Sequence, residues 1–532
     1  MQEAQGLRRY PCCGTSPSRG ILCQHQVSKG ESALLHRHGW IRVGLGLVTL
    51  LAVTAAAAAS SLDQQIETLL NRSKLDPRVR LSITILDAQT GRTLGSHRPD
   101  AAMIPASNMK LLTSAVAADV LGPDFVFESH LLIQPGVDGS PKRVIVQGSG
   151  DPAFADPELL QEMRLSVEDL LETWVSALRS AGALDVEELV VDDRIFDRDF
   201  VHPTWPEAQL NRRYCAEVAG FNFHTNILSI YTTPTREGAA PTLRTEPDSP
   251  WISLNNRART VGRSGNHTAW ASRRHGSNDI GVHGDIRHAS SPVPVTVHNI
   301  PEYFATLLAH RIRSAGGSVA TVRTADMSDD FSDAIAIHTV RTPLSVVLER
   351  CNKDSSNLYA EALLKRIGHE ITRTPGSWAN GATVIRMNIL ERIGPEAASH
   401  IIVADGSGMS RQNRVTTGVI ARWLHAVGAD ERIGRFFIDS LPTAGEGTLR
   451  RRMRDRQSNN TIRAKSGYLS GVSALSGYVI DESTGRKVIF AVISNERPGN
   501  VALAAVRNIE EEIILIADAW LTERSRATSS AR

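Results

Sequence analysis

Hydrophobic positions between residues 61 and 121 predict a helix, a hairpin and a second helix. Residues 61–73 carry leucine and isoleucine at helical spacing, which predicts a short amphipathic helix. Residues 79–86 alternate between apolar and polar positions like a strand, and a Gln-Thr-Gly turn leads from them into a second short strand. Pro105 is predicted to open the second helix, which ends near Leu121 because a Gly-Pro pair follows.

Regular patterning returns after residue 326. Helical spacing comes first and is followed by three strand-like runs and a final helix. The predicted elements are helices at 344–352, 357–372 and 383–393, strands at 461–464, 475–481 and 488–494, and a helix at 501–520. This order indicates that the two ends of the chain share one antiparallel sheet flanked by helices.

Residues 125–325 have a different character. Short β-like runs are interrupted by proline, glycine and polar stretches, and residues 257–291 are rich in Arg, Ser, Gly and His with little apolar periodicity. A loop of that length is unusual inside a compact domain, so we predict an inserted domain here. The basic residues of the tract are interpreted as solvated loop surface rather than as a nucleic-acid site.

Residues 43–59 form an uncharged apolar run that follows Arg37, His38 and Arg42 and ends in five alanines. A positive region, an apolar region and a small-residue end predict a secretory signal cleaved near Ala59, and therefore export to the periplasm or cell envelope. The alternative is a retained membrane anchor, for which 17 residues are at the short end of the spanning range.

Composition changes this picture in two ways. The 532 residues include 59 Lys and Arg against 57 Asp and Glu, so a net charge of +2 gives no basic field for a nucleic acid. Removing residues 1–59 takes away six cations and two anions, which changes the net charge to −2.

Lysine occurs only eight times. Because burial can neutralise a lysine but not an arginine, the lysines that remain point to chemistry.

Cys215 and Cys351 are the two cysteines outside residues 1–59. An oxidising compartment would permit a disulfide between them, and two separate thiols fit the sequence equally well. No Cys-His group has the spacing of zinc ligands, so we expect no metal and no other cofactor.

Ser107 and Lys110, at the start of the helix after Pro105, are the first candidates for chemistry. Residues three apart share a helix face, so the hydroxyl and the ammonium can touch. A serine needs an adjacent base to act as a nucleophile, and burial or a second cation can turn a lysine into that base. The alternative is a serine at a helix start followed by a surface lysine.

Lys465-Ser466-Gly467, in the first of the three C-terminal strands, is the second candidate. A cation followed by a hydroxyl can hold a substrate carboxylate, and the glycine lets a ligand approach the backbone. An edge strand could also pair with a peptide and supply an oxyanion-hole N–H from Tyr468. The alternative is a strand-end lysine before a turn glycine.

Ser355-Ser356-Asn357, at the entry of a predicted helix, is the third candidate. Serine is a good helix cap, and Ser-x-Asn recurs at 253/255, 264/266 and 458/460, so simple capping is the alternative. The position of Ser355 between the other two motifs favours a functional role.

Ser-x-x-Lys, Ser-x-Asn and Lys-Ser-Gly, in this order, form the signature set of penicilloyl-serine transferases. The chain resembles the type-4, low-molecular-mass class C penicillin-binding proteins, which are D-alanyl-D-alanine carboxypeptidases and DD-endopeptidases. Residues 148–152, 357–361, 405–411 and 441–445 also match that family. The similarity covers nearly all of residues 61–522, including the insertion. Ser466 stands where the family usually has threonine, and Tyr468 where it has a small residue.

The resemblance implies a role for each motif. Ser107 attacks the carbonyl of the penultimate D-alanine, Lys110 takes its proton, and Ser355 relays a proton to the leaving amine. The residues implied to bind the substrate are Asn357, Lys465, Ser466, Gly467 and Tyr468. Residues 405–408 are interpreted as a tight turn that lines the site rather than as a catalytic group.

The predicted fold class is α/β of the α+β type, a penicillin-binding or β-lactamase-like transpeptidase fold split by a large, mostly β insertion. The predicted parts are an N-terminal extension and signal at 1–59, a catalytic domain at 60–124 and 326–523, its insertion at 125–325 and a polar tail at 524–532.

The implied function is a penicillin-sensitive serine-type D-Ala-D-Ala carboxypeptidase or DD-endopeptidase. Its implied partners are peptidoglycan stem peptides, with β-lactams as covalent inhibitors. Two alternatives stay open at this point, a β-lactamase-like hydrolase and a non-catalytic peptidoglycan-binding protein.

Overall fold

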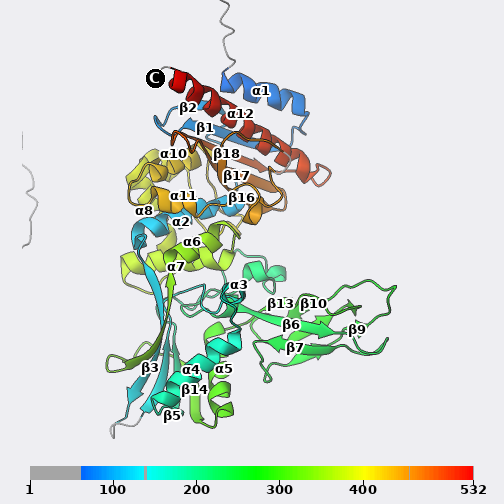
Figure 1. The fold of residues 1–532 in the computed structure, drawn as a ribbon, viewed down its shortest axis with the longest axis vertical. Helices are drawn as coiled ribbons and strands as arrows, with labels where there is room; N and C mark the ends of the chain where they lie inside the picture. Colours follow the sequence, from blue (N-terminus) through cyan, green and yellow to red (C-terminus); the bar gives the residue numbers. More distant parts are fainter. Residues whose placement is uncertain (1–60, 137–140, 454–455, 531–532) are drawn as a thin grey trace, which may run out of the picture. The chain divides into compact units, whose positions relative to one another are not determined.

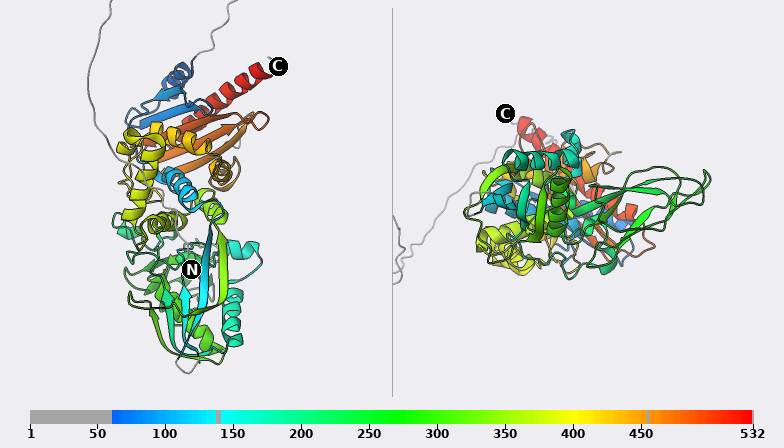
Figure 2. Two further views of the ribbon diagram at one scale, coloured as in Figure 1. Left: turned by 90° about the vertical axis from the view of Figure 1, so that its left-hand side faces the viewer. Right: turned by 90° about the horizontal axis from the view of Figure 1, so that it is seen from below.

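The computed structural model describes residues 61–136, 141–453 and 456–530. Its first sheet has five antiparallel strands in the order β16-β17-β18-β1-β2 (Figures 1 and 2). These strands are β1 (Arg80–Asp87), β2 (Thr93–His97), β16 (Thr461–Leu469), β17 (Val472–Ile480) and β18 (Lys487–Asn495). Pairing of β1 with β18 along the whole of β1 confirms that the two ends of the chain share one antiparallel sheet.

Helices cover both faces of this sheet. α1 (Leu62–Ser73) and α12 (Leu503–Ser530) pack on one face, where they bury the apolar side chains of β1 that alternate with its polar ones. On the other face, the hydroxyls of Ser82 and Thr84 contact the Thr417 hydroxyl at 2.7 and 2.9 Å. Thr417 begins α10 (Thr417–Gly428), so the alternation of β1 decides which helix lies on which face.

The remaining helices of this region lie around the second face. They are α2 (Lys110–Leu121), α6 (Leu344–Asn352), α7 (Asn357–Thr372), α8 (Trp378–Ile393), α9 (Pro395–Ser399) and α11 (Gly434–Asp439), with the short 3-10 turn η1 (Ala106–Met109). Another 3-10 turn, η5 (Gly447–Leu449), packs Leu449 into the core on the first face. α8 starts before the predicted residue 383 because Ser377 and Asn380 form a capping box at its N-terminus.

A second five-stranded sheet has the order β14-β5-β4-β3-β15. Its strands are β3 (Val126–Pro135), β4 (Pro141–Gln147), β5 (Asp185–Asp192), β14 (Ser318–Thr324) and β15 (Ile335–Pro343). Helices α4 (Val167–Ser180) and α5 (Ile300–Ser314) pack on it around the buried Trp174. β15 lies beyond residue 325 and still pairs with β3, so this sheet extends to Pro343. The division of the chain at residues 125 and 325 stays a proposal.

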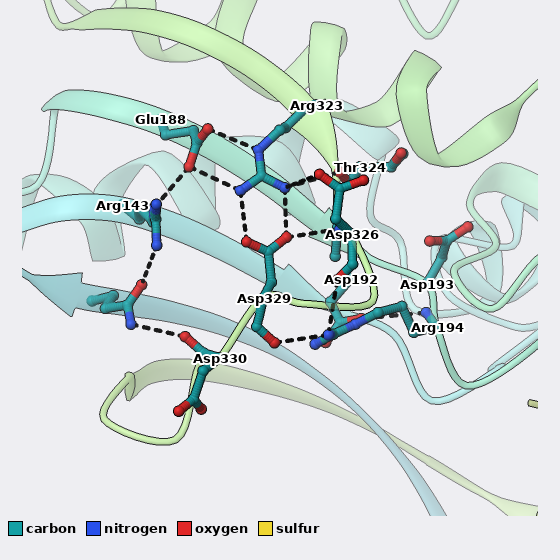
Figure 3. A network of polar contacts seen from close by, with 12 residues as sticks. Arg143, Glu188, Asp192, Asp193, Arg194, Arg323, Thr324, Asp326, Asp329 and Asp330 are labelled. Atoms are coloured by element: carbon teal, nitrogen blue, oxygen red, sulfur yellow. Dashed lines mark hydrogen bonds and ion pairs between the residues drawn. The ribbon is translucent and has the colours of Figure 1, made fainter. Parts of the chain in front are cut away.

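A charged network fastens the loop between β14 and β15 to this sheet (Figure 3). Arg323 on β14 binds Glu188 on β5 at 2.8 Å and Asp329 in the loop at 2.6 Å. Arg143 on β4 contacts Glu188 at 2.7 Å. The hydrogen bond from Arg323 lowers the pKa of Asp329 to about 2, so the loop stays tied to the strands over the whole physiological pH range.

Short strands form a third region, which projects from the second sheet in Figure 1. They are β6 (Ile227–Thr233), β7 (Thr242–Glu246), β8 (Leu254–Asn256), β9 (Arg259–Thr260), β10 (Trp270–Arg273), β11 (Ile280–His283), β12 (Asp285–Ile286) and β13 (Val293–Thr296). The short helices between the sheets are α3 (Pro157–Glu162), η2 (Glu207–Gln209), η3 (Arg213–Cys215) and η4 (His224–Asn226). The basic tract 257–291 therefore contains strands that are too short to show an alternating pattern in the sequence.

Among the described residues, none of the helices is both long and apolar enough to span a bilayer. The apolar run at 43–59, predicted as a secretory signal with a membrane anchor as the alternative, lies outside the described residues.

Candidate active site

Ser107 lies in the 3-10 turn η1, immediately before α2. The sequence predicted an α-helix from Pro105 onward, and the structure differs because the backbone of Ala106 takes a left-handed φ of 47°. In a 3-10 turn, residues i and i+3 eclipse one another. The predicted contact therefore forms all the same, with Lys110 Nζ 3.3 Å from Ser107 Oγ.

Two glycines allow the chain to close on Ser107 from both sides. A Cβ at Gly467 on β16 would lie 3.0 Å from the Ser107 nitrogen, and a Cβ at Gly408 would lie 1.8 Å from the Ala106 carbonyl oxygen. The second distance is far below any real contact, so residues 405–408 can pack there only with glycine. These approaches hold the Ser107 turn between the edge strand β16 and the 405–408 turn, as the interpretation of 405–408 as a site-lining turn requires.

Lys110 is fully buried and makes three hydrogen bonds. Besides Ser107, its Nζ donates to Asn357 Oδ1 at 2.7 Å and to the Ser407 carbonyl at 2.8 Å. Burial lowers the pKa of Lys110 to about 8, against the opposing effect of nearby carboxylates. A lysine with that pKa has a substantial neutral fraction near physiological pH and can act as a general base.

Lys465 and Ser355 form a second pair of amine and hydroxyl, beside the pair of Lys110 and Ser107. Its buried Nζ donates to Ser355 Oγ and to the Ser466 carbonyl, both at 2.8 Å. Burial, and then the positive charge of Lys110, hold the pKa of Lys465 well below its usual range. Ser355 has a φ of 60°, a left-handed conformation that is unusual for serine. It lies in the turn immediately before α7.

Asn357, the first residue of α7, connects Lys110 to Tyr214 in the middle part of the chain. Its Oδ1 accepts from Lys110, and its Nδ2 donates to the Tyr214 carbonyl at 2.8 Å. With both ends of the amide used, the side chain has one fixed orientation. The exposed Tyr214 belongs to η3, so the region between the two sheets reaches the candidate site.

The structure brings all three sequence motifs together. Ser466, Gly467 and Tyr468 follow Lys465 on β16, the edge strand of the first sheet, where Tyr468 is 52% exposed. An edge strand has unpaired backbone groups that a peptide can use. The geometry thus combines a serine with an adjacent buried amine, a second serine–lysine pair and an open strand, which suits acyl transfer from a peptide.

Sequence reasoning missed the residues that hold the motifs in place. Asn108, inside the first motif, donates from Nδ2 to the Lys465 carbonyl at 2.7 Å and so ties η1 to β16. The Ser407 carbonyl and the Tyr214 carbonyl contribute only backbone atoms. Asn108, next to the candidate nucleophile Ser107, was a signal that the sequence offered. The contacts of Ser407 and Tyr214 use backbone carbonyls, so the side chains at these positions do not reveal them.

Cys215 and Cys351 are both buried and free, so the disulfide is excluded and two separate thiols are present. Cys351 lies close enough to the two lysines to be affected by their charges, but burial dominates and raises the pKa of its thiol to about 11. The thiol stays protonated at physiological pH and is a poor nucleophile.

Comparisons with known proteins cover most of the chain. A model of the D-Ala-D-Ala carboxypeptidase 3 (S13) family matches residues 62–519. A D-alanyl-D-alanine carboxypeptidase of Actinomadura sp. (strain R39) is 31% identical over 481 residues, with 86% of each chain covered. Penicillin-binding protein 4 from Haemophilus influenzae superposes with a TM-score of 0.68 at 20% identity, over 84% of this chain and 98% of that one. Its complex with a β-lactam superposes with a TM-score of 0.64 at 20% identity, over 85% and 98%.

Proposed function

Because the chain belongs to the D-Ala-D-Ala carboxypeptidase 3 (S13) family, we propose that it hydrolyses D-alanyl-D-alanine bonds of peptidoglycan stem peptides with Ser107 as its nucleophile. The enzyme is a hydrolytic peptidase, as the family and its curated relatives are. The assignment of Ser107 rests on one observation above all, the 3.3 Å contact between its Oγ and the buried amine of Lys110. A serine hydroxyl becomes nucleophilic only when such a base is adjacent.

Acylation begins when Ser107 Oγ bonds to the carbonyl carbon of the penultimate D-alanine. The hydroxyl proton passes to the neutral amine of Lys110. The carbon–nitrogen bond to the terminal D-alanine then breaks, and Ser355 gives its proton to the leaving amine. The two lysines return a proton to Ser355, so the proton taken from Ser107 ends on the released D-alanine.

Substrate binding falls to the second and third motifs. Lys465 and Ser466 hold the terminal carboxylate, while Asn357 binds a backbone amide of the peptide. Gly467 lets the peptide approach β16, and the backbone N–H groups of residues 107 and 468 stabilise the oxyanion. Water hydrolyses the acyl-enzyme in the second half of the reaction and restores the Ser107 hydroxyl.

The same acylation explains sensitivity to β-lactams, whose strained amide takes the place of the peptide bond. Binding of a β-lactam by penicillin-binding protein 4 from Haemophilus influenzae supports this for the fold. The substrate belongs to the cell wall, so we propose export through the signal at 43–59, to the periplasm or the cell envelope. Cross-linked peptides present the same type of bond, which makes endopeptidase cleavage a second outcome of one mechanism.

Labelling with a fluorescent penicillin tests the assignment of Ser107. Ser107→Ala should abolish both labelling and D-alanine release from a pentapeptide, the latter measured by mass spectrometry of muropeptides. Ser356→Ala is the matched control, because the Ser356 side chain makes no capping hydrogen bond at the start of α7. A Ser107→Ala protein that still becomes labelled would refute the assignment.

A further inference from the structure

α7 carries three polar side chains on one face, at a spacing of four residues. Asn357, Glu361 and Lys365 follow one another along this face, and Glu361 and Lys365 are fully buried. Asn357 contacts Lys110 at one end of the row, and Lys365 binds Asp197 at 2.6 Å at the other. Glu361, between them, has no part in the mechanism described above.

The carboxylate of Glu361 accepts three hydrogen bonds. Oε1 accepts from the Ser407 N–H at 2.8 Å, and Oε2 accepts from the Gly406 N–H and from the Trp378 indole N–H, both at 2.9 Å. All three partners are donors, which is the pattern of an ionised carboxylate. Charged acceptors bind N–H groups about twice as strongly as neutral ones.

The 405–408 turn, which Glu361 holds through two N–H groups, is also the turn to which Lys110 donates a hydrogen bond. Ser407 gives its N–H to Glu361 and its carbonyl to Lys110 Nζ, the latter at 2.8 Å. Thr113 on α2 fixes the Gly406 carbonyl at 2.8 Å. Ser407 thus links the buried carboxylate of Glu361 to the buried amine of Lys110. Any movement of the 405–408 turn displaces the Ser407 carbonyl, which accepts from the Lys110 ammonium.

We propose that Glu361 is a positioning residue for Lys110, because it fixes the Ser407 carbonyl against the lysine amine and places a negative charge behind it. This inference rests on the proposed role of Lys110 as the base. Glu361 acts through the 405–408 turn and through its charge, without touching the substrate.

The other charged groups around this pair are few. Those that act on Lys110 or Glu361 are Asp405, Cys351, Lys465 and Lys365. Burial and then Asp405 raise the pKa of Glu361, while its N–H donors lower it. Asp405 is itself bound by the N–H groups of Gly408, Ser410, Trp205 and Asn413. Lys365 is engaged by Asp197 and lies 3.8 Å from the centre of the Trp378 ring.

Glu361→Gln, which keeps the shape and removes the charge, tests the proposal. The readout is the second-order rate constant of acylation by a fluorescent β-lactam, measured across neutral and alkaline pH. Without the anion the ammonium of Lys110 is less stable, so its pKa falls and the acid limb of the profile should move about one unit toward lower pH. The plateau rate should fall about 10- to 100-fold, because the base loses its fixed position.

Glu370→Gln is the matched control. It makes the same chemical change on the same helix, where Glu370 pairs with Arg366 and Arg373 at the far end of α7, and it should leave the profile unchanged. A folded Glu361→Gln protein whose acid limb coincides with that of the wild type overturns the proposal, even if its rate falls. A wild-type protein that is never acylated refutes instead the proposed function.

Trp378→Phe provides a second test if Glu361→Gln does not fold. It removes one N–H donor from Glu361 and keeps a ring beside Lys365. Because that hydrogen bond lowers the pKa of Glu361, its loss leaves less of the anion near neutral pH. The acid limb should move in the same direction by a smaller amount, and an unchanged limb would again overturn the proposal.

Discussion

At the scale of single residues, Lys110 and Lys465 differ from other lysines of the chain in their partners. Lys365 and Lys353 contact carboxylates at 2.6 and 3.0 Å. Within the described residues, Lys110 and Lys465 instead donate to hydroxyl, amide and carbonyl oxygens. Burial lowers the pKa of Lys110, Lys465 and Lys365 alike, but only at Lys365 does a directly bound carboxylate oppose that effect.

The pKa of Lys110 predicts the pH dependence of acylation. Only the neutral amine accepts a proton, and its fraction rises with pH, so the acylation rate should increase as the pH rises through about 8. Lys110→Arg keeps the charge and removes the basicity, which should lower the rate about 10²- to 10⁴-fold at every pH. Stopped-flow fluorescence with a β-lactam measures both effects.

Lys74→Arg is the matched control for that substitution, since Lys74 is an exposed residue at the C-terminal end of α1. It should acylate at the wild-type rate. If Lys110→Arg retains turnover within tenfold of the wild type, another group is the base.

At the scale of elements, strongly periodic segments were predictable and contact-dependent ones were not. α7 has the predicted bounds 357–372, because its apolar face is continuous and it starts at a turn residue. β16 runs to Leu469, past the predicted residue 464, because the motif at 465–467 is polar and yet held by pairing with β17. The left-handed turn at Ala106 had no local signal, since alanine rarely adopts it and only packing imposes it.

The residues of the candidate site also divide into those that the sequence indicates and those that only the contacts of the folded chain reveal. Side-chain chemistry and their spacing pointed to Ser107 and Lys110, whereas Ser355 and Lys465 were predictable only from the order of the three motifs along the chain. Glu361 is a buried residue whose partners are two backbone N–H groups some 45 residues away and the Trp378 indole, so its contacts could not be read from spacing along α7.

The 405–408 turn offers a test of packing at this scale. Gly408→Ala should lower the melting temperature and abolish penicillin labelling, because the new methyl would lie 1.8 Å from the Ala106 carbonyl oxygen and push the Ser107 turn aside. Gly316→Ala controls for backbone strain alone. It has a similar φ of 90° and no atom within 4 Å of the added carbon, so it should cost about 1 kcal/mol and keep full labelling. Equal effects of the two substitutions would contradict the packing argument.

At the scale of the whole molecule, the middle of the chain is bound to the helices of the candidate site. Asp156, which caps α3, accepts the Tyr359 hydroxyl at 2.5 Å and contacts Arg350 at 3.0 Å. Tyr359 lies in the first turn of α7, two residues after Asn357. Together with the Tyr214 carbonyl, this contact makes the position of Asn357 depend on residues from the region between the sheets.

Asp156→Ala should therefore affect stability and activity together. Removing one member of a buried, charged cluster leaves the Tyr359 hydroxyl without its acceptor and Arg350 without its fully buried carboxylate, and should cost about 3–5 kcal/mol of unfolding free energy, measured by urea denaturation. Glu158→Ala is the matched control, since Glu158 pairs with the same Arg350 at 2.6 Å but is 53% exposed. It should cost less than about 1 kcal/mol. A milder effect at Asp156 than at Glu158 would contradict the role of this cluster.

The pairing of β1 with β18 has a consequence for biosynthesis. Arg80 and Glu496, at one end of this pairing, are 416 positions apart, so β1 has no partner on that side until almost the entire polypeptide has been synthesised. Pairings this distant in sequence form slowly, because a long loop must close first. A ribosome-bound chain therefore carries Ser107 and Lys110 long before Lys465 and the strands and helices that complete the candidate site. If the chain is exported as proposed, such delayed assembly keeps it inactive and unfolded while it crosses the membrane.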